Sequence, residues 1–384
     1  MKRVTNILKT NKYIYFIYWM TFSLLLKIIG MFIKTDKKTI LFNSYGGKKF
    51  DDSPKIIYEY MIKQKQYNDY KFYWSFDTPD DIIIPKGEKL KNNSLRFFLV
   101  ALKAKYWITN SGIERGLKFK KKSTIYVNTW HGSPIKHIGL DENKSKVQLK
   151  TSKPDYFFVQ SQYDYNILKR VFNLSDSNMV PVGLPRNDIL STYDENDVNS
   201  IKNKLNIPLE KKVILYAPTF REYTRDSEGC FLKPPINFEK WKKELSDEYI
   251  VLFRAHYEVV KLINFEETNF VKNFSDYKNL NDLLIISDIL ISDYSSIIFD
   301  YSITEKPIYN YVYDFDEYYE KRGLYFNIKE KMPNNCFENE EEMIKKIKNI
   351  DFDEEREITK KFRSEFVEYY GNATKYIDRI MRGK

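Results

Sequence analysis

From Thr39 onward, short β-rich runs alternate with amphipathic helical runs, and this alternation constrains the fold more than any other feature of the sequence. The runs that predict strands in the first half are Thr39–Asn43, Phe72–Ser75, Tyr106–Thr109, Thr124–Asn128, Tyr156–Gln160 and Met179–Val182. Helices are predicted between them at Pro54–Gln64, Ser94–Lys105 and Ser161–Phe172, with Ser53, Ser94 and Ser161 as N-caps. Because strands that alternate with helices pair in parallel, the pattern predicts an α/β fold with helices on both faces of a parallel sheet.

A second series of the same kind follows Pro208 and predicts a second sheet. Its expected strands and helices are Val213–Ala217, Tyr249–Phe253, Ile289–Ser292 and Ile308–Tyr311, and Phe238–Leu245, Asn281–Ser287 and Ser296–Ser302. A chain of 384 residues suits two such domains, with the polar stretch Ser191–Asn206 as the candidate connection and charged helices over Glu338–Met381. We therefore expect an N-terminal segment at 1–38, α/β domains at 39–200 and 201–349, and C-terminal helices at 350–384.

Residues Tyr13–Ile33 form a long apolar stretch that is interrupted by Lys27 and has lysines on both sides. About 20 apolar residues suffice to span a bilayer, but the Tyr and Trp residues in this stretch favour the headgroup level. The stretch has three possible interpretations: a helix in the membrane interface, a helix that spans the membrane, and a buried core helix. We favour membrane association. No small-residue cleavage site follows, so a removed signal peptide is not expected. A catalytic body that consumes a cytosolic nucleotide would lie on the cytoplasmic side.

The chain has 63 Lys+Arg and 53 Asp+Glu, hence a net charge of +10, with both signs interleaved along the sequence. A nucleic-acid-binding protein usually concentrates its basic residues on one face, so we expect no nucleic-acid partner. The excess positive charge is either a solvated surface or an attraction to anionic lipid or substrate. Two cysteines, Cys230 and Cys336, build no disulfide framework and fit no metal-ligand spacing, which favours a reducing compartment.

Chemically distinctive residues follow five of the predicted strands. In chain order they are Trp130–Pro134, Gly183–Asp188, Pro218–Arg221, Arg254–His256 and Asp293–Ser296. Ligands of open α/β sheets bind beyond the carboxyl ends of the strands. Gly and Pro also end strands for structural reasons alone, so a single coincidence is weak evidence. Five together indicate a ligand site.

The chain has only three histidines, and two of them occupy equivalent places. His131 and His256 each come directly after a predicted strand, one in each expected domain, which favours a shared cleft over two structural histidines. His137 lies in an expected helical turn, Pro134–Leu140, and is interpreted as structural.

Arginine, serine and aspartate residues at other strand ends suit a phosphorylated ligand. Arg186 and Arg254 carry guanidinium forks that bind phosphate bidentately, although a surface ion pair is an equal alternative. Ser295 and Ser296 open a helix whose N-terminus could hold phosphate, or Ser296 is an ordinary N-cap. Asp300 lies on the same helix face as Ser296 and could accept ribose hydroxyls or belong to a packing layer.

Absent motifs narrow the function further. The sequence contains no GxGxxG, no GxxxxGK[ST] and no GxSxG, so a dinucleotide fingerprint, a P-loop and a nucleophile elbow are excluded. Asp314–Asp316 resembles a metal-binding DxD motif, but we expect it in a solvated acidic loop, Asp314–Glu320. We predict no cofactor and assign no metal to this motif; whether a divalent metal is required stays open.

Taken together, the motifs resemble the CDP-glycerol glycerophosphotransferase family, the teichoic acid synthases, from about Leu41 to Tyr311. The matching segments are Asp52–Lys55 with Ile57–Tyr60, Thr129–Lys136, Gly183–Asp188, Tyr216–Arg221, Arg254–His256 and Ser292–Tyr301. The departures are small: Ser133 stands where Thr is common, Ala255 and Tyr257 where Met and Pro often flank the second histidine, and His137 where Lys is frequent.

The resemblance implies a glycosyltransferase-B-like fold, two Rossmann-like domains that face each other across a cleft. The positions implied to bind CDP-glycerol are Trp130, His131, Gly132, Ser133, Pro134, Arg186, Pro218, Thr219, Arg254, Ala255, His256, Ser295, Ser296 and Asp300. The implied reaction transfers glycerol phosphate from CDP-glycerol to a hydroxyl of an undecaprenyl-diphosphate-linked disaccharide and releases CMP, at the cytoplasmic leaflet of the cell membrane. Because the long N-terminal region of the polymerising members is absent, the layout resembles the primase type.

Within this resemblance, His131 and His256 are the expected catalytic residues. His131 would be the general base, because an imidazole titrates near the working pH. His256 and Arg254 would neutralise the pyrophosphate. The alternatives are a CDP-ribitol-dependent or capsule polyol-phosphate transferase, a poly(glycerol phosphate) polymerase, a sugar-nucleotide glycosyltransferase and, in a different class, a non-catalytic membrane adaptor.

Overall fold

The computed structural model describes residues 12–141, 150–219, 221, 235–255, 259–260 and 266–383. The chain forms two compact units. The first comprises Met1–His131, Gly139–Arg186 and Asn372–Lys384, and the second comprises Gly132–Ile138 and Asn187–Gly371. The chain therefore changes unit directly after His131 and directly after Arg186, two of the residues singled out in the sequence.

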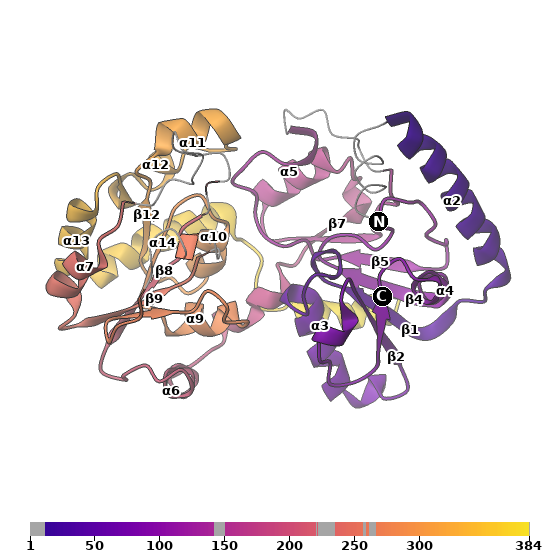
Figure 1. The fold of residues 1–384 in the computed structure, drawn as a ribbon, viewed down its shortest axis with the longest axis horizontal. Coiled ribbons are helices and arrows are strands. Elements are labelled where there is room, and N and C mark those ends of the chain that lie inside the picture. Colours follow the sequence, from indigo (N-terminus) through magenta and orange to yellow (C-terminus); the bar gives the residue numbers. More distant parts are fainter. Residues whose placement is uncertain are drawn as a thin grey trace. The chain divides into compact units, whose positions relative to one another are not determined.

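A parallel sheet forms the centre of the first unit, with seven strands in its described residues in the order β3-β2-β1-β4-β5-β6-β7 (Figure 1). These strands are β1 (Asp36–Asn43), β2 (Lys71–Phe76), β3 (Glu88–Lys91), β4 (Ala104–Thr109), β5 (Ile125–Asn128), β6 (Tyr156–Val159) and β7 (Met179–Pro181). The chain order reverses between β1 and β4, where Ile40 pairs with Tyr106. The carboxyl ends of these two strands are the switch point at which such sheets bind ligands.

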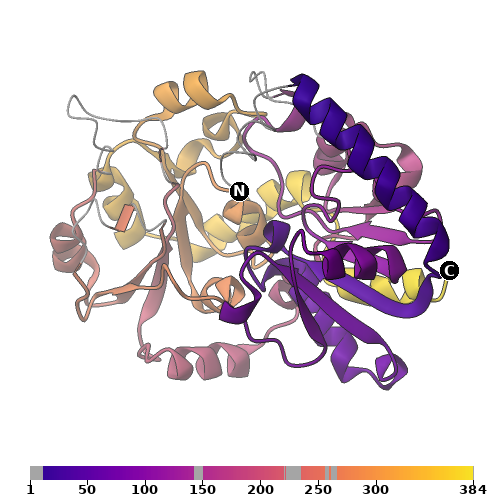
Figure 2. The same ribbon diagram turned by 45° about the vertical axis from the view of Figure 1, so that its right-hand side comes forward.

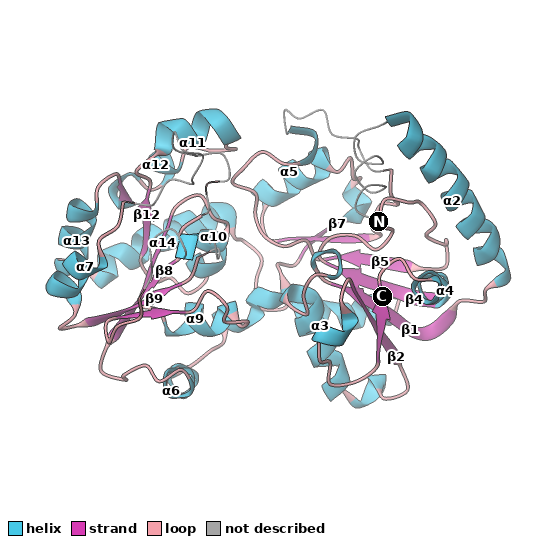
Figure 3. Cartoon of the chain, viewed as in Figure 1, coloured by secondary structure: helices cyan, strands magenta, loops and turns pink. Residues whose placement is uncertain are grey.

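Helices cover both faces of this sheet (Figure 3). The helices of the unit are α2 (Lys12–Phe32), α3 (Asp52–Lys63), α4 (Leu95–Lys103), α5 (Gln162–Val171) and α15 (Ala373–Met381). Side chains of β1 alternate between two cores: Ile40 and Phe42 pack with α3 and with Ile377 of α15, whereas Leu41 packs with α4 and with Leu26 of α2. This alternation follows from the two-residue period of a strand.

The second unit repeats the design with a parallel sheet of six strands in its described residues, in the order β10-β9-β8-β11-β12-β13. The strands are β8 (Lys212–Tyr216), β9 (Tyr249–Phe253), β10 (Val271–Asn273), β11 (Ile289–Ser292), β12 (Ile308–Tyr311) and β13 (Cys336–Phe337). The switch point of this sheet lies between β8 and β11, which pair through Leu215 and Leu290.

Helices of the second unit lie on both sides of its sheet (Figure 3). They are α6 (Glu195–Lys204), α7 (Phe238–Leu245), α9 (Leu280–Ile286), α10 (Ile297–Ser302), α11 (Phe315–Arg322), α12 (Ile328–Lys331), α13 (Glu340–Lys348) and α14 (Phe352–Phe366). A buried cluster joins Trp241 of α7 and Met343 of α13 to Tyr216 and Phe253 of the sheet. Phe299 of α10 stacks on Phe362 of α14. The predicted α/β fold with two Rossmann-like units is confirmed.

The apolar N-terminal stretch forms α2, which lies along the first unit (Figure 2). Its buried side carries Tyr15, Ser23 and Leu26, spaced by about two turns and one turn of helix. Gly30 continues this stripe, because a Cβ atom there would lie 3.0 Å from a methyl carbon of Leu102. The opposite side exposes eleven large apolar residues: Tyr13, Ile14, Phe16, Ile17, Met20, Phe22, Leu24, Leu25, Ile28, Met31 and Phe32.

The strands and helices predicted from the sequence are present, with small shifts at their ends. Of the three predicted N-caps, Ser94 and Ser161 accept hydrogen bonds from the first turns of α4 and α5. Ser53 was wrongly predicted as a cap, because Asp51 occupies that position and accepts from the nitrogen of Asp52. The polar stretch Ser191–Asn206 holds the helix α6, which begins with a capping box at Asp194.

Candidate functional site

The loops that follow β1 and β4 are hydrogen-bonded to each other at the switch point of the first unit. The main-chain nitrogen of Tyr45 donates to Oδ1 of Asn110 over 2.8 Å, and that of Gly46 donates to Oγ of Ser111 over 2.9 Å. Asn110 is fully buried. Side chains immediately beyond β4 therefore hold the first turn of the loop that follows β1 and contains Tyr45.

His131, which follows β5, reaches this switch point with its imidazole. Its Nδ1 lies 2.8 Å from the main-chain oxygen of Asn110. A carbonyl oxygen only accepts hydrogen bonds, so Nδ1 carries the proton and Nε2 is left as the basic nitrogen. The ring of Trp130 lies 4.0 Å from the His131 ring and also packs against Phe157 and Phe172. The geometry suits a histidine that accepts a proton through Nε2.

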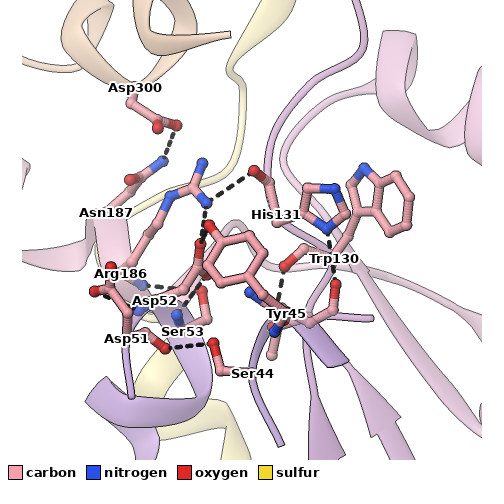
Figure 4. Close-up of polar contacts among 12 residues, drawn as sticks. Ser44, Tyr45, Asp51, Asp52, Ser53, Trp130, His131, Arg186, Asn187 and Asp300 are labelled. Atoms are coloured by element: carbon pink, nitrogen blue, oxygen red, sulfur yellow. Dashed lines mark hydrogen bonds and ion pairs between the residues drawn. The ribbon is translucent and has the colours of Figure 1, made fainter. Parts of the chain in front are cut away.

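Asp52 lies at the centre of a hydrogen-bonded group near His131 (Figure 4). Its Oδ2 accepts from the hydroxyl of Tyr45 over 2.5 Å and from a terminal guanidinium nitrogen of Arg186 over 2.6 Å. The same nitrogen of Arg186 donates to the main-chain oxygen of His131 over 2.9 Å. We call Tyr45, Asp52, Arg186 and His131 the Asp52 network.

Charges in the Asp52 network affect the groups that titrate. Burial raises the pKa of the Asp52 carboxyl, but the charge of Arg186 and the bonds from Tyr45 and from the nitrogen of Ser53 outweigh it and hold that pKa below its ordinary value. Burial lowers the pKa of His131 below 6.5; its bond to Asn110 and the charge of Asp52 oppose this effect, and Arg186 adds to it. His131 is therefore neutral at pH 7 and able to act as a base.

Backbone conformation singles out the same residues. Tyr45, Asp52 and Trp130 have φ values of 48°, 63° and 54°, in the left-handed region that large side chains rarely adopt. Backbone strain of this kind persists where surrounding contacts fix the conformation, and it gathers at functional sites. Asn93, Arg115 and Asn173 of the same unit also have positive φ, so this strain accompanies the site but is not confined to it.

The switch point of the second unit is tied together through Asp293, which follows β11. Both carboxylate oxygens of Asp293 lie 3.0 Å from the main-chain nitrogen of Thr219, which is three residues beyond Tyr216, the last residue of β8. Arg221 donates to Asp293 over 2.9 Å and to Asp314 over 2.7 Å, and all three side chains are largely buried. The buried ion pairs fix the main chain around Thr219.

The expectation of a solvated acidic loop at Asp314–Glu320 is wrong. Residues Phe315–Arg322 form the helix α11, which buries Phe315 and Tyr318 against the unit. Asp314 is a partner of Arg221 and also accepts from the hydroxyl of Tyr294 over 3.2 Å. Among the described residues, no group of three or more His, Cys, Asp or Glu side chains gathers as a metal-ligand set.

Ser295 and Ser296 precede α10, as expected, at the carboxyl end of β11. Ser296 occupies the N-cap position, but its side chain makes no capping hydrogen bond. Asp300 lies buried within α10 and accepts from Nδ2 of Asn187 over 2.7 Å (Figure 4). Asn187 directly follows Arg186, so the same short segment supplies a partner to Asp300 and a partner to Asp52.

Arg254 begins the loop after β9 and holds a neighbouring loop. One of its terminal nitrogens donates to the main-chain oxygens of Phe274 and Tyr277, over 2.9 and 2.6 Å. The nitrogen of Ala255 donates to Oγ of Ser275 over 3.1 Å. His256 lies outside the described residues, and so does Phe220 of the Tyr216–Arg221 motif.

Gly132, Ser133 and Pro134 are buried residues of the second unit, which the chain enters after His131. The predicted helical turn at Pro134–Leu140 is wrong over most of its length, because the segment is extended and forms a bridge between Lys136 and Leu324. His137 donates its main-chain N–H to the oxygen of Gly323 over 3.1 Å. A side chain at Gly323 would collide with the His137 ring, since its Cβ would lie 2.4 Å from Nδ1.

Buried polar atoms at both switch points have no hydrogen-bond partner among the described residues. They include Oδ1 of Asn43 and Nδ2 of Asn110 in the first unit and Oγ1 of Thr219 in the second. A buried donor without a partner is costly, and in native proteins it usually meets a ligand or an ordered water. Both switch points thus offer polar groups to a ligand.

Comparison with known proteins relates these sites to a family. The sequence model of the family described as CDP-Glycerol:Poly(glycerophosphate) glycerophosphotransferase matches residues 25–382. This chain belongs to that family. The resemblance seen in its motifs is confirmed.

The family includes relatives that match most of this chain. A teichoic acid glycerol-phosphate transferase of Staphylococcus aureus is 36% identical over 86% of this chain and 87% of its own length. A teichoic acid poly(glycerol phosphate) polymerase of Staphylococcus epidermidis is also 36% identical, over 82% of this chain; this chain spans 46% of that relative. A structure of the wall teichoic acid polymerase TagF, a variant soaked with CDPG, superimposes with a TM-score of 0.82 at 31% identity, covering 94% of this chain and 92% of the other.

Sequence reasoning missed Tyr45 and Asp52 as members of the site. Asp52 opens the family segment Asp52–Lys55, yet only the structure pairs it with Arg186, 134 residues away. Tyr45 lies in a loop between two predicted elements, where its neighbours Gly46 and Gly47 indicated only a turn. A signal for each residue was its position at the edge where ligands bind: Asp52 is the first residue of α3, and Tyr45 lies two residues after the end of β1.

Proposed function

We propose that this chain transfers glycerol phosphate from CDP-glycerol to a hydroxyl of an undecaprenyl-diphosphate-linked disaccharide and releases CMP. Membership of the glycerophosphotransferase family supports the donor, together with the TagF structure that was soaked with CDPG. The observation that carries the proposal is His131, neutral at pH 7 with Nδ1 bound to Asn110 and Nε2 left basic.

The reaction is an in-line displacement at the β-phosphorus. Nε2 of His131 takes the proton of the acceptor hydroxyl. The oxygen of that hydroxyl forms a bond to the β-phosphorus, while the bond between the β-phosphorus and the oxygen of the departing CMP breaks. In the second unit, Thr219, Ser295, Ser296 and Arg254 are proposed to hold the nucleotide and its phosphates. His256, Ala255 and Pro218 belong to the same proposed set, as do Trp130, Gly132, Ser133, Pro134, Arg186 and Asp300.

Two comparisons bear on the donor and on the number of units transferred. Relatives named ribitol-phosphate polymerases are 27% identical to this chain, against 36% for the glycerol-phosphate transferase of S. aureus, which favours glycerol. We propose primase-type transfer of one or a few units. The alternative is a polymerase, which is supported by a relative of that name in Bacillus spizizenii, 33% identical over 90% of its length.

For the location we propose the cytoplasmic face of the membrane, with α2 lying in the interface. Tyr15, Trp19 and Ser23 hydrogen-bond to the first unit through Gly116, Lys150 and Lys118, over 2.9, 2.7 and 2.9 Å. A helix that is hydrogen-bonded to the first unit at these three residues would have to break the contacts in order to span a bilayer. Its exposed apolar side favours burial in lipid at about 25 cal/mol per Å².

The proposal is tested by incubating the purified protein with CDP-glycerol and a lipid-linked disaccharide acceptor and measuring CMP release. We expect CMP from CDP-glycerol, little from CDP-ribitol and no turnover of UDP-sugars, with one or a few units on each acceptor by mass spectrometry. Long chains on each acceptor would identify a polymerase. Absence of both CMP release and CDP-glycerol binding by calorimetry would contradict the proposal and favour an adaptor.

A further inference from the structure

We propose that Asp52 is a positioning residue for the transfer reaction, acting through Arg186 to fix the main chain of His131. The inference rests on the proposed function, since it assigns His131 the role of base. It adds a residue outside the implied CDP-glycerol-binding positions. Asp52 acts on His131 indirectly. Its carboxylate contacts Arg186 and Tyr45, and Arg186 contacts the main-chain oxygen of His131.

The local backbone gives Asp52 one fixed position. Its φ of 63° would be strained in most residues, and Asp51 stabilises it by accepting from the nitrogen of Asp52 over 2.8 Å. Oδ1 of Asp52 accepts from the nitrogen of Ser53 over 2.5 Å. Asp52 is also the first residue of the twelve-residue helix α3, where the helix dipole favours a negative charge. Contacts within residues 51–53 therefore already fix the Asp52 carboxylate, without the contribution of Arg186 and Tyr45.

Arg186 connects α3 to the segment of His131. Its main-chain nitrogen donates to Oγ of Ser53 over 3.3 Å, and its guanidinium donates to Asp52 over 2.6 Å. The guanidinium nitrogen that binds Asp52 also binds the oxygen of His131. His131 is therefore held at its main-chain oxygen by Arg186 and at Nδ1 by the oxygen of Asn110, which together set the direction of Nε2.

The pair is buried, so neither partner is replaceable by water. The side chains of Asp52 and Arg186 are 3% and 12% exposed. Removing one charge would leave the other uncompensated in a poorly solvated site. The titratable groups that face His131 in the described part of the first unit are Asp52, Arg186 and Tyr45, whose ring lies 5.7 Å from the imidazole. The negative charge of Asp52 raises the pKa of His131, and the positive charge of Arg186 lowers it.

A direct test follows the three histidines by NMR, with ¹³C-labelled imidazoles and the His131 signal assigned by its loss in His131→Gln. Asp52→Asn removes a negative charge, so the pKa of His131 is expected to fall. Arg186→Gln removes a positive charge, so the pKa of His131 is expected to rise. Asn also tolerates the positive φ of this position. Turnover measured in parallel is expected to show kcat of Asp52→Asn reduced by about 10- to 100-fold, with a smaller change in KM for CDP-glycerol.

Two further variants separate positioning from general stability. Tyr45→Phe keeps every charge and loses one hydrogen bond to Asp52, so kcat falls less than in Asp52→Asn and the His131 titration stays unchanged. Glu355→Gln is the matched control, because Glu355 is a fully buried carboxylate paired with Lys346 over 2.7 Å in the second unit. It is expected to lower the melting temperature and to leave the His131 titration and kcat unchanged.

A folded Asp52→Asn variant with wild-type kcat and a wild-type His131 titration would overturn the inference. If Asp52→Asn does not fold, Arg186→Gln decides: an unchanged His131 titration there overturns the link, and an upward shift supports it. The NMR titration needs no turnover, so it can be measured even if the wild-type protein releases no CMP. Absence of CMP release would contradict the proposed function, and the titration alone would then test whether Asp52 acts on His131 through Arg186.

Discussion

Nδ1 of His131 lies 2.8 Å from the main-chain oxygen of Asn110, and this contact joins the end of β5 to the end of β4. In many enzymes a carboxylate orients the catalytic histidine; in this chain a peptide oxygen holds the imidazole of His131. A neutral partner stabilises the imidazolium less than a carboxylate would, so burial dominates and the pKa of His131 stays below its ordinary value. The arrangement favours a base that is already deprotonated at neutral pH.

Replacement of His131 by Gln is expected to lower kcat by about 100-fold or more, because the acceptor hydroxyl loses its base. CMP release under saturating CDP-glycerol measures the effect. His137→Gln is the control, since that residue packs against Tyr325 and takes no part in the proposed chemistry. Folded His131→Gln protein with near-native kcat would exclude His131 as the base.

The pH dependence of turnover is expected to follow the neutral form of His131. Burial lowers its pKa, so the fraction of neutral His131 rises as pH increases through a midpoint below 6.5, and the neutral form predominates at pH 7. We therefore expect kcat/KM to change little between pH 7 and 8 and to fall in acid below 6.5. An acidic limb centred above pH 7 would show that another group, or a protonated histidine, controls the rate.

The central strands could be predicted closely from the sequence, whereas three of the four edge strands could not; the edge strand β7 was predicted. β9, β11 and β12 begin and end at the predicted residues, because buried strands are continuous apolar runs that stop at turn residues. The missed strands β3, β10 and β13 all lie at sheet edges. In β3 only Leu90 is buried, so its pairing depends on main-chain hydrogen bonds that leave no side-chain pattern.

The site shows the same division. His131 and Arg186 were identifiable because they directly follow strands, where α/β sheets bind ligands. The pairing of Arg186 with Asp52, and of Arg221 with Asp314, joins residues 134 and 93 positions apart, and no local pattern encodes such contacts. Asp314 was misjudged because an acidic run is usually solvated, whereas here one carboxylate compensates a buried guanidinium.

Arg221→Met is expected to destabilise the protein by about 3–5 kcal/mol, because it leaves Asp293 and Asp314 as buried carboxylates without their counter-ion. Urea unfolding followed by tryptophan fluorescence measures the loss. Lys321→Met is the matched control: Lys321 pairs with Glu317 on the exposed side of α11, and its loss should cost less than about 1 kcal/mol. Adding Asp293→Asn and Asp314→Asn to Arg221→Met should recover part of the stability; no recovery would argue against the charge explanation.

The last helix, α15, is expected to stabilise the first unit. Ile377 is fully buried in the same core as Ile40 and Phe42, so Ile377→Ala should cost about 2–5 kcal/mol. Lys375→Ala on the exposed side of α15 should change stability by less than about 0.5 kcal/mol. Hydrogen exchange locates the effect, with faster exchange expected in α3; equal exchange in the two variants would contradict it.

The attachment of α15 is also expected to weaken in strong alkali. Asp378 accepts from the hydroxyl of Tyr60 over 2.7 Å, and burial together with this bond raises the pKa of Tyr60 to about 12. A raised pKa means that the contribution of Tyr60 to stability is complete below pH 10 and is lost as pH rises toward 12. Tyr60→Phe should remove this part of the pH dependence.

The exposed side of α2 is expected to bind membranes, and point substitutions test this better than a truncation. Deleting residues 1–34 would also strip Leu26 from the core it shares with Leu102, and so would change folding and binding together. Leu24, Leu25 and Ile28 lie on the exposed side, and each contributes about 1 kcal/mol when the rest of its surface enters lipid. Replacing all three by Gln should therefore weaken partition into vesicles by about 100-fold.

Sedimentation with vesicles that contain phosphatidylglycerol measures this partition, and the melting temperature of the triple variant should stay near that of the wild type. Leu26→Ala, on the buried side of the same helix, is the opposite case. It should lower stability by about 2–5 kcal/mol and leave the partition of the folded protein unchanged. If the triple variant still sediments fully, the membrane contact lies elsewhere on the basic surface of the protein; added salt would then release it, because exposed charges more than about 10 Å apart are screened at 0.1 M ionic strength.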